Sequence, residues 1–407
     1  YTNKVRDGRL ELSHEPLFGW SGTVGMQYTD GTFGGLNLID LHVPSTNFYG
    51  FDGHTRYVTE NTGLFLSERR AFGAVDVEVA VRKDWRSVGV PIPGRFFIRV
   101  PDEYIPSYEQ MYGANWRQEL EADMREGHVS RNPDRKHRPL SASVGATWDL
   151  GGGYAAALSL ARTERAPTVR ELFAFGNNLA TNSYELGLLA DWEFIDPILG
   201  EAGIFRGDVL EQSDALNLTF RQAGGPLEFE VGLFHQEVDD YVYAHALETE
   251  TRNGVAHHFL VYTAGKARFS GIDGQASYRL TPASRVTVFG DYVHAELGDA
   301  KGYLPRIPPA RLGARYQGDW GPLTAGFEVY RQFTQDRLAP LETRTDGYNM
   351  LNATLAYRFP HGAGRWTELY LSGTNLTDEL AYSHASFVKA QSPLRGRNIV
   401  FGLRNQF

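Results

Sequence analysis

Residues 140–150 read LSASVGATWDL, in which the apolar side chains fall on alternate positions. Because successive residues of a β-strand point to opposite faces, this alternation predicts a strand with one apolar and one polar face. The same period of two recurs at residues 75–85 and 351–359. Many such strands in series predict an all-β fold, a transmembrane antiparallel β-barrel.

The composition of the 407 residues is compatible with this barrel. No stretch approaches the roughly 18 consecutive apolar residues that a membrane-spanning helix needs. A barrel exposes only every second residue of a strand to lipid, so a mean hydropathy of −0.36 does not argue against a membrane location. The net charge of −9 argues against nucleic acid as a partner, and the absence of cysteine excludes disulfides and thiolate metal sites.

Short and long connections alternate along the sequence. The short ones are rich in Gly and Pro and lie at 15–19, 72–74, 150–153, 223–226, 281–284, 320–322 and 360–364. The long ones cover roughly 29–59, 87–137, 164–207, 246–256, 298–307, 336–346 and 378–395. Short turns at one rim and long loops at the other are typical of an outer-membrane barrel. We therefore expect the long loops outside the cell and the C-terminus in the periplasm.

The segments between these connections give about fifteen strands, and 208–222 and 227–245 are long enough to project beyond a bilayer. Single-chain bacterial barrels normally have an even number of strands. An open sheet in lipid would also leave unpaired backbone groups along its edges. We therefore expect that strands are missing on the N-terminal side, and that residues 1–407 are the C-terminal part of a larger barrel.

The last strand has a terminal aromatic residue. Ile399, Phe401, Leu403 and Phe407 share one face of the segment 397–407. A terminal aromatic residue on such a strand is the signature that the insertion machinery of outer-membrane barrels reads. We expect Phe407 to serve as this signal.

Three further blocks of sequence resemble signatures of the TonB-dependent outer-membrane receptors. They are ERAPTVRELF (164–173) with NLATNSYE (178–185), GTNLTD (373–378) and GRN (396–398). Five others are most similar to the zinc-uptake branch of that family: YTNK (1–4), YVYA (241–244), PARLG (309–313), ETRT (342–345) and YSHASF (382–387). The likeness extends over essentially the whole chain.

The resemblance implies a 22-stranded barrel with an N-terminal plug that imports a scarce nutrient, with zinc as the leading substrate. It also implies coupling to the TonB complex through the plug, and contact with outer-membrane lipid and lipopolysaccharide. Residues 1–407 correspond to about fifteen of those strands and have no counterpart of the plug or of the TonB box. We expect this polypeptide to form most of the wall of a transporter and to have no enzymatic activity.

Zinc bound here would need imidazole or carboxylate ligands, since the chain has no cysteine. The candidate ligands are His245, His257, His258 and His384. His257 and His258 are neighbours, so on a regular strand they point to opposite faces and cannot both bind one ion. The alternative is that these histidines are solvated residues of the loops.

The stretch AFGNN (174–178) contains no histidine, although the zinc-uptake branch is expected to have one just before its LATN block. The substrate could therefore be a haem, a siderophore or another metal chelate, received at an aromatic entrance. Candidates for that entrance are Phe173, Phe175, Trp192, Phe194 and Phe205. The alternative is that these aromatic residues only pack the loop.

Three other classes of protein remain as alternatives. A passive porin-like channel would share the barrel, and a soluble β-rich binding protein would share the strands. An outer-membrane hydrolase has little support, because no nucleophile-elbow, HExxH or phosphate-loop motif is present. The charged loop 87–137 is expected to include a short helix near Trp116–Met124 and to form a lid or a solvated cap.

Overall fold

One large β-sheet makes up most of the protein. The computed structural model describes residues 2–35, 48–52, 55–178, 181–189, 204–205, 207–252, 255–298, 302–362 and 364–407. The sheet contains nineteen strands. Fifteen of them form a continuous wall: β1 (Thr2–Leu17), β2 (Trp20–Gly35), β4 (Thr55–Phe72), β5 (Val75–Gly89), β8 (Leu140–Gly151), β9 (Tyr154–Arg165), β12 (Glu211–Gln222), β13 (Leu227–Arg252), β14 (Val255–Thr281), β15 (Ser284–Leu297), β17 (Arg311–Trp320), β18 (Leu323–Gln332), β19 (Tyr348–Gly362), β20 (Arg365–Thr374) and β21 (Asn398–Gln406).

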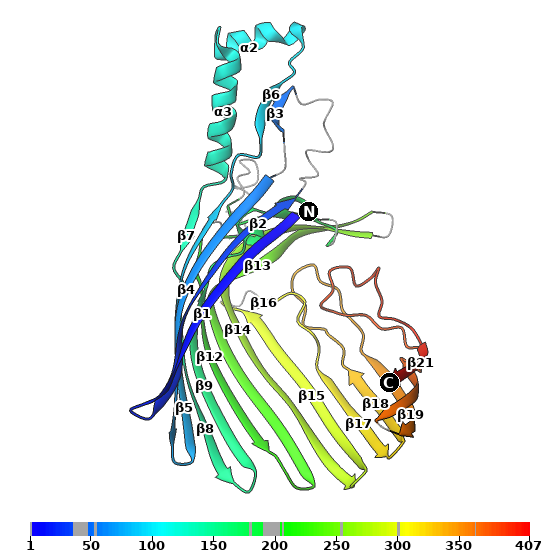
Figure 1. Ribbon diagram of the computed structural model, residues 1–407. Helices are drawn as coiled ribbons and strands as arrows, with labels where there is room; N and C mark the ends of the chain where they lie inside the picture. Colours follow the sequence, from blue (N-terminus) through cyan, green and yellow to red (C-terminus); the bar gives the residue numbers. More distant parts are fainter. Residues whose placement is uncertain are drawn as a thin grey trace.

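Each strand of this wall pairs in antiparallel fashion with the next one along the chain, which confirms the predicted all-β class and the count of about fifteen strands. Figure 1 shows the wall as one curved layer. β1 and β21 stand at the two ends of the order, and no pairing between them occurs among the described strands. The fifteen-stranded wall is therefore a single curved layer and not two stacked layers.

The remaining elements lie in the long connections. They are β3 (Tyr49–Asp52), β6 (Arg95–Ile98), η1 (Asp102–Tyr104), α2 (Ile105–Tyr112), α3 (Trp116–Arg131), β7 (Arg135–His137), α4 (Val169–Phe173), β10 (Phe175–Asn178), β11 (Ser183–Leu186) and β16 (Gly302–Tyr303). The helix expected near Trp116 is confirmed as α3, which is 16 residues long. It packs with α2 and the β3–β6 pair around the buried Val100, Trp116 and Leu120, in a unit that projects above the wall (Figure 1). None of the helices that the structure describes is long and apolar enough to cross a membrane.

The predicted alternation of short and long connections is confirmed with one exception. Tight turns close one rim of the wall, and glycines such as Gly73 (φ 63°) provide the left-handed backbone that these turns need. The exception is the connection predicted at 246–256, because β13 and β14 continue through it and pair up to Arg252 and Val255. With 26 and 27 residues, these strands are about 90 Å long, whereas about 10 residues suffice to cross a bilayer.

Large apolar side chains cover one face of the wall and are exposed there. Val144 and Trp148 of β8 are 44% and 55% exposed, and Leu160 of β9 is 49% exposed. The opposite face carries polar pairs, such as that between Arg82 and Asp84, whose atoms lie 2.8 Å apart. An apolar face that no protein layer covers is what a wall bathed in lipid requires.

The apolar band crosses the hydrogen-bonded rows of the sheet at an angle. One row, here called the tilted row, runs through ten successive strands on the apolar face: His14, Gly22, Glu68, Val79, Val144, Leu160, Leu216, His235, Ser270 and His294. Both ends of this row are polar, and its middle is apolar. At the first end, His14 Nε2 lies 2.9 Å from Glu68 Oε1.

Strand tilt explains the polarity of the two ends. With neighbouring strands about 4.8 Å apart, nine steps along the row cover about 43 Å. If the strands are inclined by about 40°, the row climbs about 28 Å, close to the roughly 25 Å height of a barrel's apolar band. The His14 end and the His294 end would therefore lie at opposite surfaces of a flat hydrocarbon layer.

We predict that Val144→Arg, which places a charge in the middle of the tilted row, lowers the free energy of unfolding in lipid vesicles by about 2–4 kcal/mol. Ser143→Arg, one residue away on the opposite face, should cost no more than about 1 kcal/mol. Urea titration of the refolded chain, followed by heat-modifiable gel migration, measures both. Equal losses for the two variants would show that lipid does not contact the apolar face.

Candidate functional site

A cavity of about 570 Å³ lies at the end of the wall that carries the long connections. Its lining comes mainly from the upper part of the β13–β14 hairpin and from three connections, which follow β15, β18 and β20, with Ile204 of the connection after β9 and Leu297 of β15 completing it. The lining includes polar, aromatic and charged side chains from four parts of the sequence. A volume of this size suits a small organic ligand or a metal chelate.

Three of the four predicted histidines line this cavity. His245 comes from β13, His258 from β14 and His384 from the connection after β20, whereas His257 is exposed and does not line it. The prediction that neighbouring histidines on a strand diverge agrees with this placement. Among the residues that the structure describes, no group of three or more His, Asp or Glu side chains is arranged to hold a metal ion.

His384 belongs to a polar cluster that ties the three connections together. Its ring is buried, with Nδ1 2.8 Å from the Thr345 hydroxyl and Nε2 3.7 Å from Glu342, too far for a hydrogen bond. Glu342 accepts hydrogen bonds from the backbone N–H groups of Arg306 (2.7 Å) and Ala339 (3.0 Å). Burial raises the pKa of the Glu342 carboxyl, but His384 and these two donors outweigh burial and hold the pKa below its ordinary value. The cluster fixes one side of the cavity.

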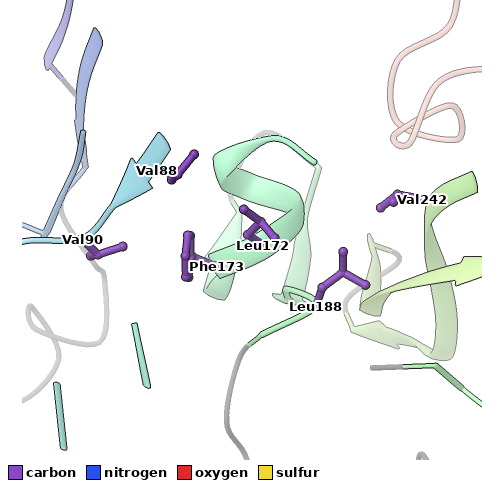
Figure 2. Close-up of a cluster of buried hydrophobic side chains, with 6 residues drawn as sticks. All are labelled: Val88, Val90, Leu172, Phe173, Leu188 and Val242. Carbon is purple, nitrogen blue, oxygen red and sulfur yellow. The ribbon is translucent and has the colours of Figure 1, made fainter. Parts of the chain in front are cut away.

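A second element, here called the crossing segment, comprises the described residues between 166 and 189 in the connection after β9. It reaches β14, with which β11 pairs in parallel, so that Ser183 lies opposite His258. Leu172, Phe173 and Leu188 of the segment pack with Val88 near the end of β5, with Val90 just beyond it and with Val242 inside β13 (Figure 2). The segment thus links β5 with the β13–β14 hairpin, which lie in distant parts of the wall.

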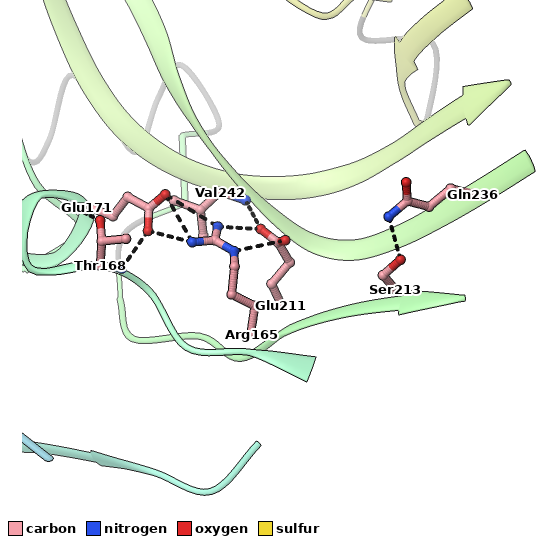
Figure 3. Close-up of polar contacts among 7 residues, drawn as sticks. All are labelled: Arg165, Thr168, Glu171, Glu211, Ser213, Gln236 and Val242. Atoms are coloured by element: carbon pink, nitrogen blue, oxygen red, sulfur yellow. Dashed lines mark hydrogen bonds and ion pairs between the residues drawn. The ribbon is translucent and has the colours of Figure 1, made fainter. Parts of the chain in front are cut away.

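Charged side chains hold the start of the crossing segment. Arg165 bridges Glu211 (2.7 Å) and Glu171 (2.9 Å), and Glu211 also accepts the backbone N–H of Val242 (Figure 3). Thr168 caps α4: its hydroxyl accepts the N–H of Glu171, whose carboxylate accepts the N–H of Thr168. One guanidinium therefore joins β9, β12 and the helix.

The end of the segment centres on Glu185, which is almost fully buried. Its carboxylate accepts hydrogen bonds from Arg170 (2.5 and 2.8 Å), Ser183 (2.7 Å) and Thr181 (3.0 Å). Burial raises the pKa of this carboxyl, but Arg170 and the hydroxyl groups outweigh it and the pKa is lowered. Sequence reasoning used this block only for the resemblance and missed its role in bracing the loop.

The predicted aromatic entrance is only partly described. Phe173 is buried and stacks on Tyr57 of β4, with ring centroids 6.1 Å apart, so it packs the loop. Phe175 and Phe205 are each exposed by about two-fifths, and neither lines the cavity. Trp192 and Phe194 lie outside the described residues.

Sequence reasoning also missed two cations at the cavity. Arg306 precedes β17, and Lys389 lies in the connection after β20; both side chains line the cavity. Neither lies in a motif that would have singled it out, because each reaches the cavity only through the path of its loop.

Comparison with known proteins gives one family and many similar folds. The family described as "TonB dependent receptor-like, beta-barrel" matches residues 1–376. The solved structure of the copper transporter OprC superposes with a TM-score of 0.69 at 17% identity, over 98% of this chain and 56% of that protein.

Two further structures have lower scores. The FrpB iron transporter from Neisseria meningitidis (F3-3 variant) gives a TM-score of 0.63 at 12% identity, over 99% of this chain and 55% of that protein. The ferric citrate transporter FecA gives a TM-score of 0.63 at 14% identity, over 99% of this chain and 55% of that protein. The chain thus spans little more than half of the length of these structures, and at such identities they share its fold.

We predict that Arg165→Gln loosens the crossing segment, because it leaves the half-buried carboxylates of Glu171 and Glu211 without their shared cation. The local free energy of opening should fall by about 1–2 kcal/mol, measured by hydrogen exchange of the amides in the segment. Arg162→Gln is the matched control, since Arg162 pairs with Asp214 at an exposed site. It should change protection by less than about 0.5 kcal/mol. Equal protection in the Arg165 variant and the unaltered chain would show that the bridge does not hold the segment.

Proposed function

The chain belongs to the TonB-dependent receptor-like β-barrel family, and on this basis we propose that it forms most of the barrel wall of an outer-membrane receptor that imports a metal-containing nutrient. The observation that carries the proposal is the cavity enclosed by three long connections and the β13–β14 hairpin at one end of a lipid-facing wall. The family is one of receptors, and we propose transport and not catalysis. The whole transporter would include further strands and an N-terminal plug that contacts the TonB complex.

The outer membrane is the proposed location. The exposed apolar face and the polar residues at both ends of the tilted row support embedding in lipid, with lipopolysaccharide and phospholipid as partners of the outer face. We place the long connections outside the cell and the C-terminus in the periplasm. Phe407, whose side chain is 99% exposed, is accessible to the barrel insertion machinery.

A small metal chelate is the proposed cargo. The relatives include proteins described as copper, iron and ferric citrate transporters, which supports a metal or metal complex in general. A cavity of about 570 Å³ is far larger than a bare ion needs. Siderophores, haem and other metal complexes all belong to this class.

Zinc is the second candidate. His245, His258 and His384 supply three imidazoles to the lining of one cavity, and neutral imidazole is a preferred zinc ligand. Against bare zinc, His384 is already engaged with Thr345 and Glu342, and no three-ligand group occurs among the described side chains. Additional ligands would have to come from outside these residues, for example from the plug.

The absence of cysteine allows a direct test of orientation in whole cells. We predict that a maleimide too large to cross the outer membrane labels Met111→Cys, in the exposed part of α2. Ala74→Cys, in the tight turn between β4 and β5, should be labelled only after the outer membrane is permeabilised. The reverse pattern would place the long connections in the periplasm.

Energy coupling separates a receptor from a porin-like channel. We predict that cells with the complete gene accumulate more of one metal than a deletion strain, measured by elemental analysis in media that supply iron, copper or zinc with and without chelators. An uncoupler that collapses the proton motive force should abolish the difference. Accumulation that persists with the uncoupler would indicate a passive channel, and accumulation of zinc only in chelator-free medium would favour zinc as the cargo.

A further inference from the structure

Arg306 is an unusual cation at the cavity. Its guanidinium lies over the ring of Phe387, with Cζ 3.8 Å from the ring centroid, in a cation–π contact. The side chain is partly buried, and both residues line the cavity. A guanidinium in contact with an aromatic ring can still donate hydrogen bonds from the N–H groups at its edge.

No described carboxylate lies within ion-pair distance of this guanidinium. Glu342 is close along the chain, but its bond to Arg306 goes to the backbone N–H at 2.7 Å. The Glu342 carboxylate also accepts the backbone N–H of Ala339, and the His384 ring lies 3.7 Å from it. Burial lowers the pKa of the Arg306 guanidinium, and the charge of Glu342 offsets this only in part.

The cavity as a whole has an excess of positive charge. Lys389 also lines it, and burial lowers the pKa of the Lys389 amine. Its Nζ donates to the Thr345 hydroxyl at 2.8 Å and to the Thr343 carbonyl, so no carboxylate neutralises it directly. Glu342 is the only acidic side chain among the described lining residues, against two cations.

A cation taken out of water without a counter-charge is costly, and a bound anion removes that cost. A guanidinium edge also matches the two oxygens of a carboxylate or phosphate group. We propose that the cavity binds the cargo through an oxyanion group, carboxylate or phosphate, held by the edge of Arg306 while Phe387 supports its face, with Lys389 as a second cation. This inference rests on the proposed function, in which the cavity receives the cargo, and it identifies that cargo as anionic.

Calorimetric titration of the full chain, refolded in detergent, tests the proposal with trisodium citrate and sodium pyrophosphate as probes. Triethyl citrate, which is uncharged, is the matched control ligand. At least one anion should bind, with an affinity that falls as salt is added, and the ester should not. Citrate and pyrophosphate separate carboxylate from phosphate recognition. Failure of both anions to bind at millimolar concentrations, or equal binding of the ester, would overturn the proposal.

Three substitutions locate the site. Arg306→Gln should weaken anion binding by about tenfold or more, and Arg306→Lys, which keeps the charge but loses the planar fork, should fall between that variant and the unaltered chain. Arg344→Gln is the control, because Arg344 is exposed on a neighbouring part of the chain and pairs with Asp346. Heat-modifiable migration reports whether each variant is folded. A folded Arg306→Gln variant that binds as tightly as the unaltered chain would refute the assignment.

Failure of the anion site and failure of the proposed transport function give different results. Anion binding that depends on Arg306, in a protein whose complete gene supports no energy-dependent metal uptake, would retain the site and remove the transport proposal. Energy-dependent uptake that is unchanged by Arg306→Gln would retain transport and remove the site.

Discussion

The geometry of the wall depends on one constraint: a sheet of tilted strands must present a level apolar band to a flat hydrocarbon layer. Rows of paired residues are perpendicular to the strands, so a row must enter the band at one surface and leave it at the other. The composition of the tilted row fits this requirement, with His14 and Glu68 at one end, Val144 in the middle and His294 at the other end. In such an arrangement the membrane surface, and not the pairing, determines where polar residues occur on the outer face.

Outside the apolar band the backbone is not surrounded by lipid, and contacts within the protein determine its path. The β13–β14 hairpin continues far beyond the length that a bilayer needs, and the crossing segment pairs with its free edge through β11. Arg165 and Glu185 supply the charges that hold the crossing segment. The crossing segment is therefore braced against the hairpin whose upper part lines the cavity, although most of the lining comes from connections.

The sequence predicted the wall well because lipid imposes a period of two on every strand that it touches. It misplaced the end of the hairpin at 246–256, because strands in water need no apolar face and leave no such pattern. Placement of His245, His258 and His384 at one cavity could not be read from spacing, since these residues come from three elements. The divergence of His257 and His258 did follow from the alternation along β14, since only His258 lines the cavity.

The charge at the cavity could not be predicted from the sequence, because the connections that line the cavity carry no periodic pattern. Bulk composition gives a net charge of −9, whereas the described cavity lining has two cations, Arg306 and Lys389, and one carboxylate, Glu342. Local charge depends on how the connections after β15, β18 and β20 fold against one another. Glu342 accepts hydrogen bonds from the backbone N–H groups of Arg306 and Ala339, and the sequence alone does not show these contacts.

Membrane embedding is tested most directly by the depth of the tilted row in lipid vesicles. Nitroxide labels can be placed one at a time on its members through single cysteines, because the chain has no other thiol. The ratio of oxygen to nickel-chelate accessibility then gives the depth of each label. If lipid bathes the apolar face, the depth is greatest at Val144 and Leu160 and small near Glu68 and His294. Equal depth along the row, or a steady rise from one end to the other, would contradict membrane embedding.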